Sequence, residues 1–122
     1  MIERLTDFPA NVLAFVCHGG VTKEDYQKVL VPAVLDRLKT PGKVRLYYET
    51  AGDFSGIAPG AVWEDFKVGM EHLMRWERMA VVTDVDWIKH TMLFFSFIMP
   101  GEMKVFPRAQ AAQAREWVVA QD

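Results

Sequence analysis

Alternation between strand-like and helix-like segments, which continues to the end of the chain, constrains this sequence most. Short runs rich in apolar and β-branched residues, at 11–19, 43–50 and 78–84, are separated by longer segments with apolar residues at helical spacing. Strands that alternate with helices pair in parallel through right-handed crossovers. We therefore predict an α/β protein with the element order β-β-α-β-α-β-α-β-α.

The first strand, predicted over residues 2–8, differs from the others because a short turn at residues 9–11 joins it to the next strand. It should therefore run antiparallel to that strand. We predict one domain over residues 1–122, with a mixed five-stranded sheet and about four packed helices. A chain of this length buries enough surface to be stable without disulfides or a metal.

The first helix, predicted within residues 22–40, carries both a start signal and an interruption. Thr22 and Asp25 have the spacing of a capping box. Pro32 removes a backbone donor and crowds the preceding turn, which predicts a kink.

The second helix, predicted within residues 61–77, has an apolar stripe at helical spacing. That stripe consists of Trp63, Phe66, Met70 and Leu73, while Glu64, Lys67, Glu71 and Arg75 are predicted to point elsewhere.

The third helix, predicted over residues 85–99, has an unusual composition. We predict that Asp86 caps it and that Pro100 stops it. Apolar residues cover almost its full circumference, although a surface helix normally keeps a polar face. We expect part of it to be covered by a second subunit, an apolar ligand or a membrane surface, through the face formed by Trp87, Ile88, Met92, Phe95 and Met99. The alternative is a helix buried entirely against its own sheet and neighbours.

Three segments resemble the SpoIIAA-like family of the STAS superfamily of anti-sigma-factor antagonists. They are TKEDYQKVLVPAVLDRL (22–38), ERMAVVTDVDW (77–87) and VFPRAQAAQAREWV (105–118). The resemblance implies a SpoIIAA/STAS-like fold and leaves the activity open. Together with the site residues considered below, it leads us to expect a non-enzymatic bacterial STAS-like regulatory or protein-interaction module. The description of the group as STAS/SEC14-type implies binding of lipid-like ligands.

In STAS regulators that resemble SpoIIAA, a serine in a D-S-S-G-like turn at a helix start is phosphorylated. The corresponding segment here is Asp53-Phe54-Ser55-Gly56, in which Phe54 replaces the first serine. Pro59 suits a first helical turn, which places Ser55 in the preceding loop. Ser55 is the phosphoacceptor candidate, and a flexible connection is the alternative.

Polar residues follow the carboxyl ends of the predicted parallel strands, where α/β sheets usually bind ligands. A histidine beside an acid could act as a general base, but no nucleophile motif or phosphate-binding loop accompanies these residues. We therefore expect them to cap helices and tie turns, and we expect no enzyme. The loop-site candidates are His18, Thr50, Asp53, Gly56, Thr83 and Asp84.

The remaining features exclude several classes of function. A net charge of −2 without a Lys/Arg cluster argues against nucleic-acid binding. The three histidines are far apart, which argues against a metal site, and no cofactor is expected. The single cysteine, Cys17, lies in an apolar run, so we expect a buried structural thiol in a reducing cytoplasm. No apolar segment is long enough to span a bilayer.

We therefore expect a cytoplasmic module that acts by binding, as a homodimer or with a protein partner. The alternative is a carrier or sensor that encloses a small apolar, lipid-like ligand between the third helix and the sheet. A ligand or a symmetric subunit contact against residues 87–99 would distinguish them.

Overall fold

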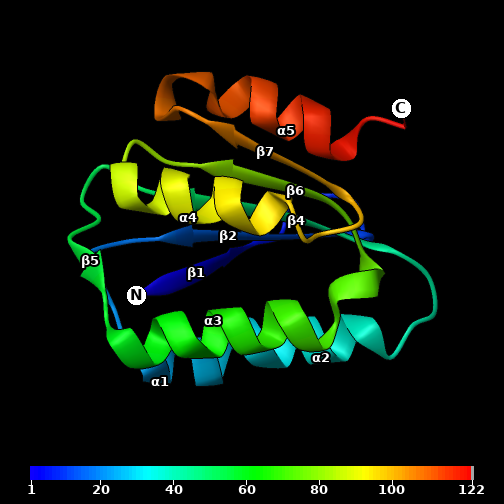
Figure 1. Cartoon of the computed structure of the whole chain (residues 1–122), viewed down its shortest axis with the longest axis horizontal. Coiled ribbons are helices and arrows are strands. Elements are labelled where there is room, and N and C mark those ends of the chain that lie inside the picture. Colours follow the sequence, from blue (N-terminus) through cyan, green and yellow to red (C-terminus); the bar gives the residue numbers. More distant parts are fainter. Residues whose placement is uncertain (122) are drawn as a thin grey trace.

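The computed structural model describes residues 1–121 and is organised around a mixed five-stranded sheet (Figure 1). Its strand order is β1-β2-β4-β6-β7, and β1 is antiparallel to β2 whereas the other three pairs are parallel. The strands are β1 (Ile2–Leu5), β2 (Val12–Cys17), β4 (Val44–Thr50), β6 (Trp76–Val82) and β7 (Glu102–Phe106). The predicted fold class, element order and antiparallel first strand are confirmed. A small parallel pair, β3 (Gly20–Val21) with β5 (Gly56–Ile57), was not predicted.

The first helical segment consists of α1 (Lys23–Asp25), a π-helical turn η1 (Tyr26–Leu30) and α2 (Val31–Leu38). The capping box is present: Thr22 Oγ1 accepts from Asp25 N–H at 3.1 Å, and Asp25 Oδ2 accepts from Thr22 N–H at 2.8 Å. Pro32 has no N–H to give to the carbonyl four residues earlier. The helix widens just before it, and Val31 N–H bonds to Tyr26 O, five residues back. The predicted interruption is therefore a π turn.

The other long helices are α3 (Pro59–Glu71), α4 (Asp86–Ser96) and α5 (Ala111–Val119), with short 3₁₀ turns η2 (Leu73–Arg75) and η3 (Arg108–Gln110). Two predicted details of α4 are wrong. Asp86 does not cap the helix, because Val85 is the N-cap residue and its N–H bonds to Thr83 Oγ1 at 3.1 Å. The helix ends at Ser96, well before Pro100.

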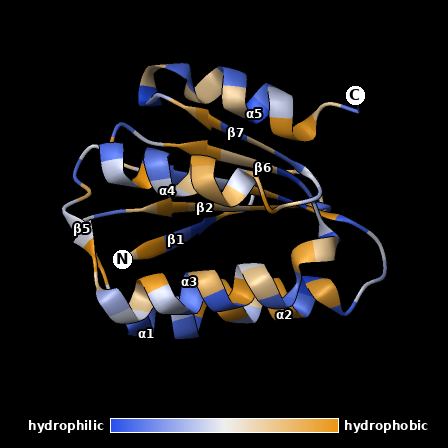
Figure 2. Ribbon diagram, viewed as in Figure 1, coloured by the Kyte–Doolittle hydropathy of each residue, from blue (hydrophilic) through white to orange (hydrophobic). Residues whose placement is uncertain are grey.

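The helices form two layers, because α1, α2, α3 and α4 lie on one face of the sheet and α5 covers the other (Figures 1 and 2). Side chains alternate between the faces along each strand. On β4, Leu46 and Tyr48 face the first layer, and Tyr47 faces α5. The α5 face is filled by a compact cluster whose buried members are Val12, Ala14, Tyr47, Ala80, Val82, Ala114 and Val118.

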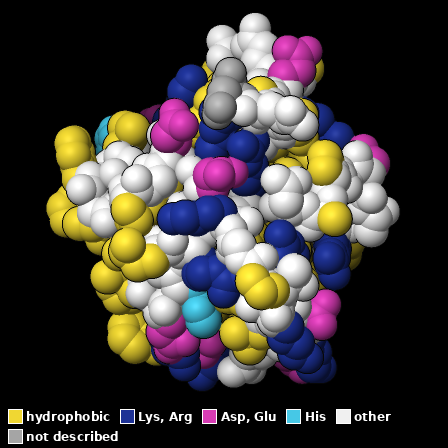
Figure 3. All heavy atoms as spheres, turned by 90° about the vertical axis from the view of Figure 1, so that its right-hand side faces the viewer, with side chains coloured by type: hydrophobic (Ala, Val, Ile, Leu, Met, Phe, Trp, Pro, Cys, Tyr) yellow, Lys and Arg dark blue, Asp and Glu magenta, His cyan; other side chains and the backbone are white. Residues whose placement is uncertain are grey.

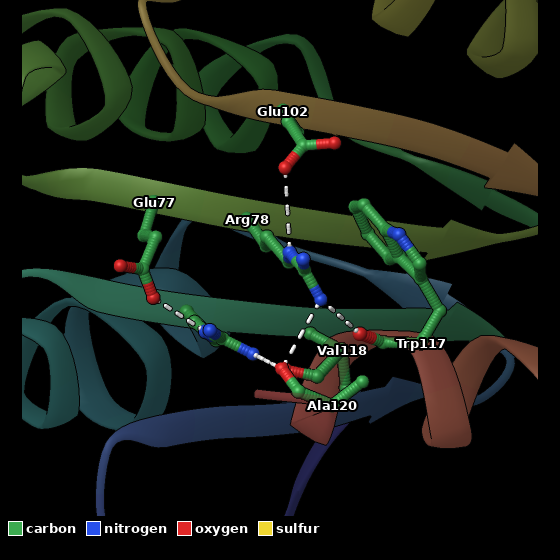
Figure 4. A network of polar contacts seen from close by, with 7 residues as sticks. Glu77, Arg78, Glu102, Trp117, Val118 and Ala120 are labelled. Atoms are coloured by element: carbon green, nitrogen blue, oxygen red, sulfur yellow. Dashed lines mark hydrogen bonds and ion pairs between the residues drawn. The ribbon is translucent and has the colours of Figure 1, made fainter. Parts of the chain in front are cut away.

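Two buried arginines of the sheet hold the C-terminal end of α5 (Figure 4). Arg45 Nη1 donates to Val118 O at 2.9 Å, and Arg78 Nη1 donates to Trp117 O at 2.9 Å. Both arginines also bond to the carbonyl of Ala120. These cations satisfy carbonyl groups that the end of a helix leaves without partners, and they complement its negative dipole end.

Candidate functional site

A cavity of about 150 Å³ lies between the sheet, the η1–α2 segment, α3 and α4. Its walls are almost wholly apolar. Side chains of β4, β6 and β7 contribute Leu46, Tyr48, Trp76, Met79, Val81 and Met103. The first helical segment contributes Tyr26, Leu30 and Val34, and Ile57 of β5 also lines it. The layer on this face therefore leaves a cavity next to the sheet.

The third predicted helix, α4, supplies one wall of the cavity. Trp87, Ile88, Met92 and Phe95 of the predicted contact face all line it. Met99 does not, since it lies beyond the end of α4 and is 5% exposed within the main core. The four residues are brought together by their helical spacing, and Thr91 is the polar side chain that lies among them.

Most of the predicted apolar stripe of α3 is exposed, although Leu73 packs against the core. Trp63 is 59% exposed, Phe66 and Met70 are also exposed, and Glu64 is 9% exposed and faces inward. The buried residues of α3 are Ala61, Glu64 and Val68. Helical spacing identified a stripe but not the side of the helix that meets the sheet. As a result, α3 exposes Trp63 and part of Phe66 to solvent, while Phe66 also borders the cavity and an acidic residue, Asp65, lies in the cavity wall.

Asp65 is the polar centre of the site and was not among the predicted residues. Tyr26 Oη donates to Asp65 Oδ1 at 3.0 Å, and the Tyr26 and Tyr48 hydroxyl oxygens are 2.7 Å apart. Burial raises the pKa of Asp65 from 3.8 to about 6, although the Tyr26 hydrogen bond opposes this shift. Burial likewise raises the pKa values of both tyrosines well above 10, so both remain protonated at neutral pH.

Cys17 lies behind these hydroxyls, in β2. Burial raises the pKa of its thiol from 9.0 to about 11, although the neighbouring Tyr48 hydroxyl opposes this shift. A thiol in this state is protonated at neutral pH and is a poor nucleophile. Its environment matches the predicted buried thiol.

Phe95 of α4 approaches α3 closely at Gly69, and both residues line the cavity. A Cβ atom at Gly69 would lie 3.2 Å from Phe95 Cζ, so the absence of a side chain at Gly69 permits this approach. The Gly69 carbonyl accepts a bond from Trp76 Nε1 at 3.3 Å. Phe95, which is half-buried, therefore packs against α3 as well as lining the cavity.

Exposed apolar side chains extend from α3 and α4 to the surface. Phe97, directly after α4, is 88% exposed, and Phe94 is 73% exposed. On α3, the rings of Trp63 and Phe66 stack with their centroids 6.0 Å apart. Figure 3 shows hydrophobic side chains concentrated along its left-hand edge, the side on which α3 and α4 lie.

The loop-site candidates lie at the carboxyl ends of the strands, where most of them make local bonds. Thr50 and Thr83, both buried, have their hydroxyl oxygens 2.7 Å apart. His18 lies between two carboxylates, with Nδ1 3.2 Å from Asp53 and Nε2 3.2 Å from Glu3. These contacts tie β1, β2, β4 and the following loops together.

The remaining candidates have similar surroundings. Asp84 Oδ1 accepts from Arg108 N–H at 3.1 Å and so fixes the start of η3. Gly56 lies in β5 with φ +151°. Ser55 is exposed, and its N–H bonds to Gly19 O at 2.9 Å. Because α3 begins at Pro59, Ser55 does not lie at the helix start.

Two signals in the sequence could have identified Asp65. Tyr26 and Tyr48 lie on the apolar stripe of a helix and in a buried strand, where hydroxyls need partners. A carboxyl two residues after Trp63, at the centre of an amphipathic helix, was a possible partner.

Within residues 1–121, no group of three or more His, Cys, Asp or Glu side chains is arranged to hold a metal ion. None of the helices in this part of the chain combines the length and hydropathy needed to cross a membrane.

Comparison with known proteins identifies the fold. The model of the family described as SpoIIAA-like matches residues 12–119. Among solved structures, the chain is similar to an uncharacterized protein from Shewanella loihica PV-4 that has a SpoIIAA-like fold. The TM-score is 0.76 at 22% sequence identity, and the match covers 96% of this chain and 93% of the other. No curated protein matches.

Proposed function

The chain belongs to the SpoIIAA-like family, and on that premise we propose that it is a non-enzymatic module that binds a small apolar molecule. The ligand occupies the cavity between α4 and the sheet, and the protein acts as its carrier or sensor. STAS-type domains are in general regulatory and non-enzymatic, which agrees with a role in binding.

The cavity is the observation that supports this function. Its walls come from four separate parts of the fold, and they include methionine and aromatic side chains that adapt to different shapes. Small-molecule sites in proteins are typically concave and apolar with a few polar groups, as this cavity is. Native cores seldom keep empty space of this kind, because the loss of contacts and the loss of buried apolar area both lower stability.

The volume limits the size of the ligand. A cavity of about 150 Å³ can hold a molecule of about the size of benzene. Burying five or six carbon atoms contributes about 4 kcal/mol, which corresponds to millimolar binding for a minimal probe. Tighter binding requires either a polar contact or a longer ligand that extends beyond the cavity.

Methyl NMR with n-hexanol tests the proposal. Hexanol should shift the methyl signals of Leu46, Met79 and Met103, which line the cavity, and leave those of Val12 and Val118 on the α5 face unchanged. Leu46→Phe should remove the shifts by filling the space. Shifts of equal size on both faces, or none at all, would contradict a ligand site in this cavity.

A second candidate function is contact with another copy of the chain, through the exposed apolar residues of α3 and α4. Phe97 and Phe94 are the most exposed of these side chains. Large exposed apolar patches commonly mark interaction surfaces. Phe97→Glu should convert a dimer to a folded monomer in light scattering, with Glu71→Gln as control. A wild-type monomer at all concentrations would contradict this function without affecting the ligand site.

A further inference from the structure

The carboxyl group of Asp65 has an unusual environment for an ionisable side chain. It lies in the cavity wall, on the inner side of α3, and Oδ1 accepts a hydrogen bond from Tyr26. Among residues 1–121, no ion pair reaches Asp65 and no donor reaches Oδ2. A charged group out of water is costly unless a partner of opposite charge compensates it.

The other lining residues do not supply such a partner. Within the part of the chain that the structure describes, the cavity wall contains no lysine, arginine or histidine. A ligand with a carboxylate or phosphate would find no counter-charge there and would meet the negative charge of Asp65. A ligand with a cationic donor would instead complete the pair.

We propose that the ligand is a small amphiphilic amine, with its cationic head on the Asp65 carboxylate and its apolar part against α4 and the sheet. This assignment rests on the proposed function, since it names the chemical class of molecule that the same cavity binds.

The two tyrosines hold the carboxylate in place for this contact. Each phenol has one proton to donate. Tyr26 gives its proton to Asp65, so the 2.7 Å contact with Tyr48 requires Tyr48 to donate to Tyr26. The chain of donors thus runs toward Asp65 and ends on Oδ1. The oxygen without a donor, Oδ2, remains available to the ligand.

The π turn before Pro32 contributes to this arrangement. It begins at Tyr26, the residue that bonds to Asp65, and it is the place where the first helix widens. Such turns are frequent at functional sites. Here the turn carries the donor that orients the carboxylate.

The pH dependence of binding follows from the groups that face Asp65. Tyr26 of η1 and Tyr48 of β4 stay protonated at neutral pH, Cys17 lies behind Tyr48, and α4 contributes no titratable group to the wall. Asp65, with a pKa of about 6, is therefore the group that titrates. Amine binding should weaken as the pH falls below 6 because the carboxylate becomes neutral.

Calorimetric titration with three probes of equal chain length tests the assignment. At pH 7.5, hexylamine should bind about tenfold more tightly than hexanol, because a charged hydrogen bond adds to the same apolar contact. Hexanoate should bind more weakly than hexanol. Asp65→Asn should bring hexylamine to the level of hexanol, whereas Glu71→Gln, an exposed acid of the same helix, should leave the ratio unchanged.

The outcomes separate this inference from the proposed function. Equal binding of hexanol and hexylamine, or tighter binding of hexanoate, would overturn the amine while keeping the apolar site. An amine preference that survives Asp65→Asn would overturn the role of Asp65. Absence of binding by all three probes would overturn both proposals.

Discussion

The two faces of the sheet differ in how their buried charged groups are paired and in the presence of a cavity. On the α5 face, Arg45 and Arg78 are buried, but each donates to carbonyl groups at the end of α5 and each lies beside a glutamate (Figure 4). On the other face, Asp65 is an acid whose partner among the described residues is a neutral tyrosine, next to a cavity of about 150 Å³. The buried charges on the α5 face are paired within the chain, whereas the other face has a cavity beside a carboxylate without a cationic partner among the described residues.

The difference separates a face that contributes stability, beneath α5, from a face that contains a cavity, beneath α3 and α4. Paired buried charges and dense packing fix α5 against β4 and β6. An unpaired carboxyl and an incompletely filled core both lower stability, and such costs are typical of functional sites. Variants that alter one face at a time test this difference.

Loss of an arginine on the α5 face should have the largest effect. Arg45→Met leaves the carbonyl groups of Val118 and Ala120, and the Glu77 carboxylate, without this donor. We expect the free energy of unfolding in urea to fall by about 3 kcal/mol. Arg4→Met, at an exposed arginine of β1, should change it by less than about 0.5 kcal/mol. Similar values for the two variants would show that the network is not stabilising.

Enlarged side chains should distinguish the faces by packing alone. Ala80 is fully buried beneath α5, so Ala80→Leu should cost about 2 kcal/mol through overpacking. Leu46→Phe enlarges a side chain that borders the cavity and should change stability by less than about 0.5 kcal/mol. Urea unfolding of both variants measures the contrast. Equal destabilisation would mean that the cavity is not available space.

Replacement of the unpaired acid should stabilise the free protein. The pKa of Asp65 is raised from 3.8 to about 6, so the folded chain binds this proton more tightly than the unfolded chain. Stability therefore falls as the pH rises from about 4 to 6, and it stays lower above that window. Asp65→Asn should raise the free energy of unfolding at pH 7.5 by roughly 2 kcal/mol, after allowance for its partial exposure, and give no gain below pH 4. Destabilisation at pH 7.5 would reveal a structural role for the carboxylate.

The sequence predicted the sheet well because its strands carry dense local signals. The apolar run at 12–17 and the turn at residues 9–11 specify β2 and its antiparallel neighbour, and Thr22 with Asp25 marks the first helix. The π turn at Pro32 was predicted as an interruption, although its geometry was not. These features depend on residues that are close in sequence, so local sequence patterns predict them.

The site depended on contacts between distant segments and was predicted in part. Residues of α4 that border the cavity were expected at a contact or ligand face because the helix has too much apolar surface. Asp65 was missed because Trp63, Phe66 and Met70 suggested the wrong buried side of α3. Which side of a helix meets the sheet is decided by tertiary packing, here by Gly69 against Phe95 and by Tyr26 against Asp65.

Diffraction from crystals of the protein under xenon pressure tests the asymmetry of the two faces most directly, because xenon enters apolar cavities. We expect a xenon peak between α3, α4 and the sheet, beside Leu46, Met79 and Met103, and none between α5 and the sheet. In the Leu46→Phe variant the peak should disappear. A wild-type crystal without xenon at this position, or with equal occupancy beneath α5, would show that the two faces do not differ in this way.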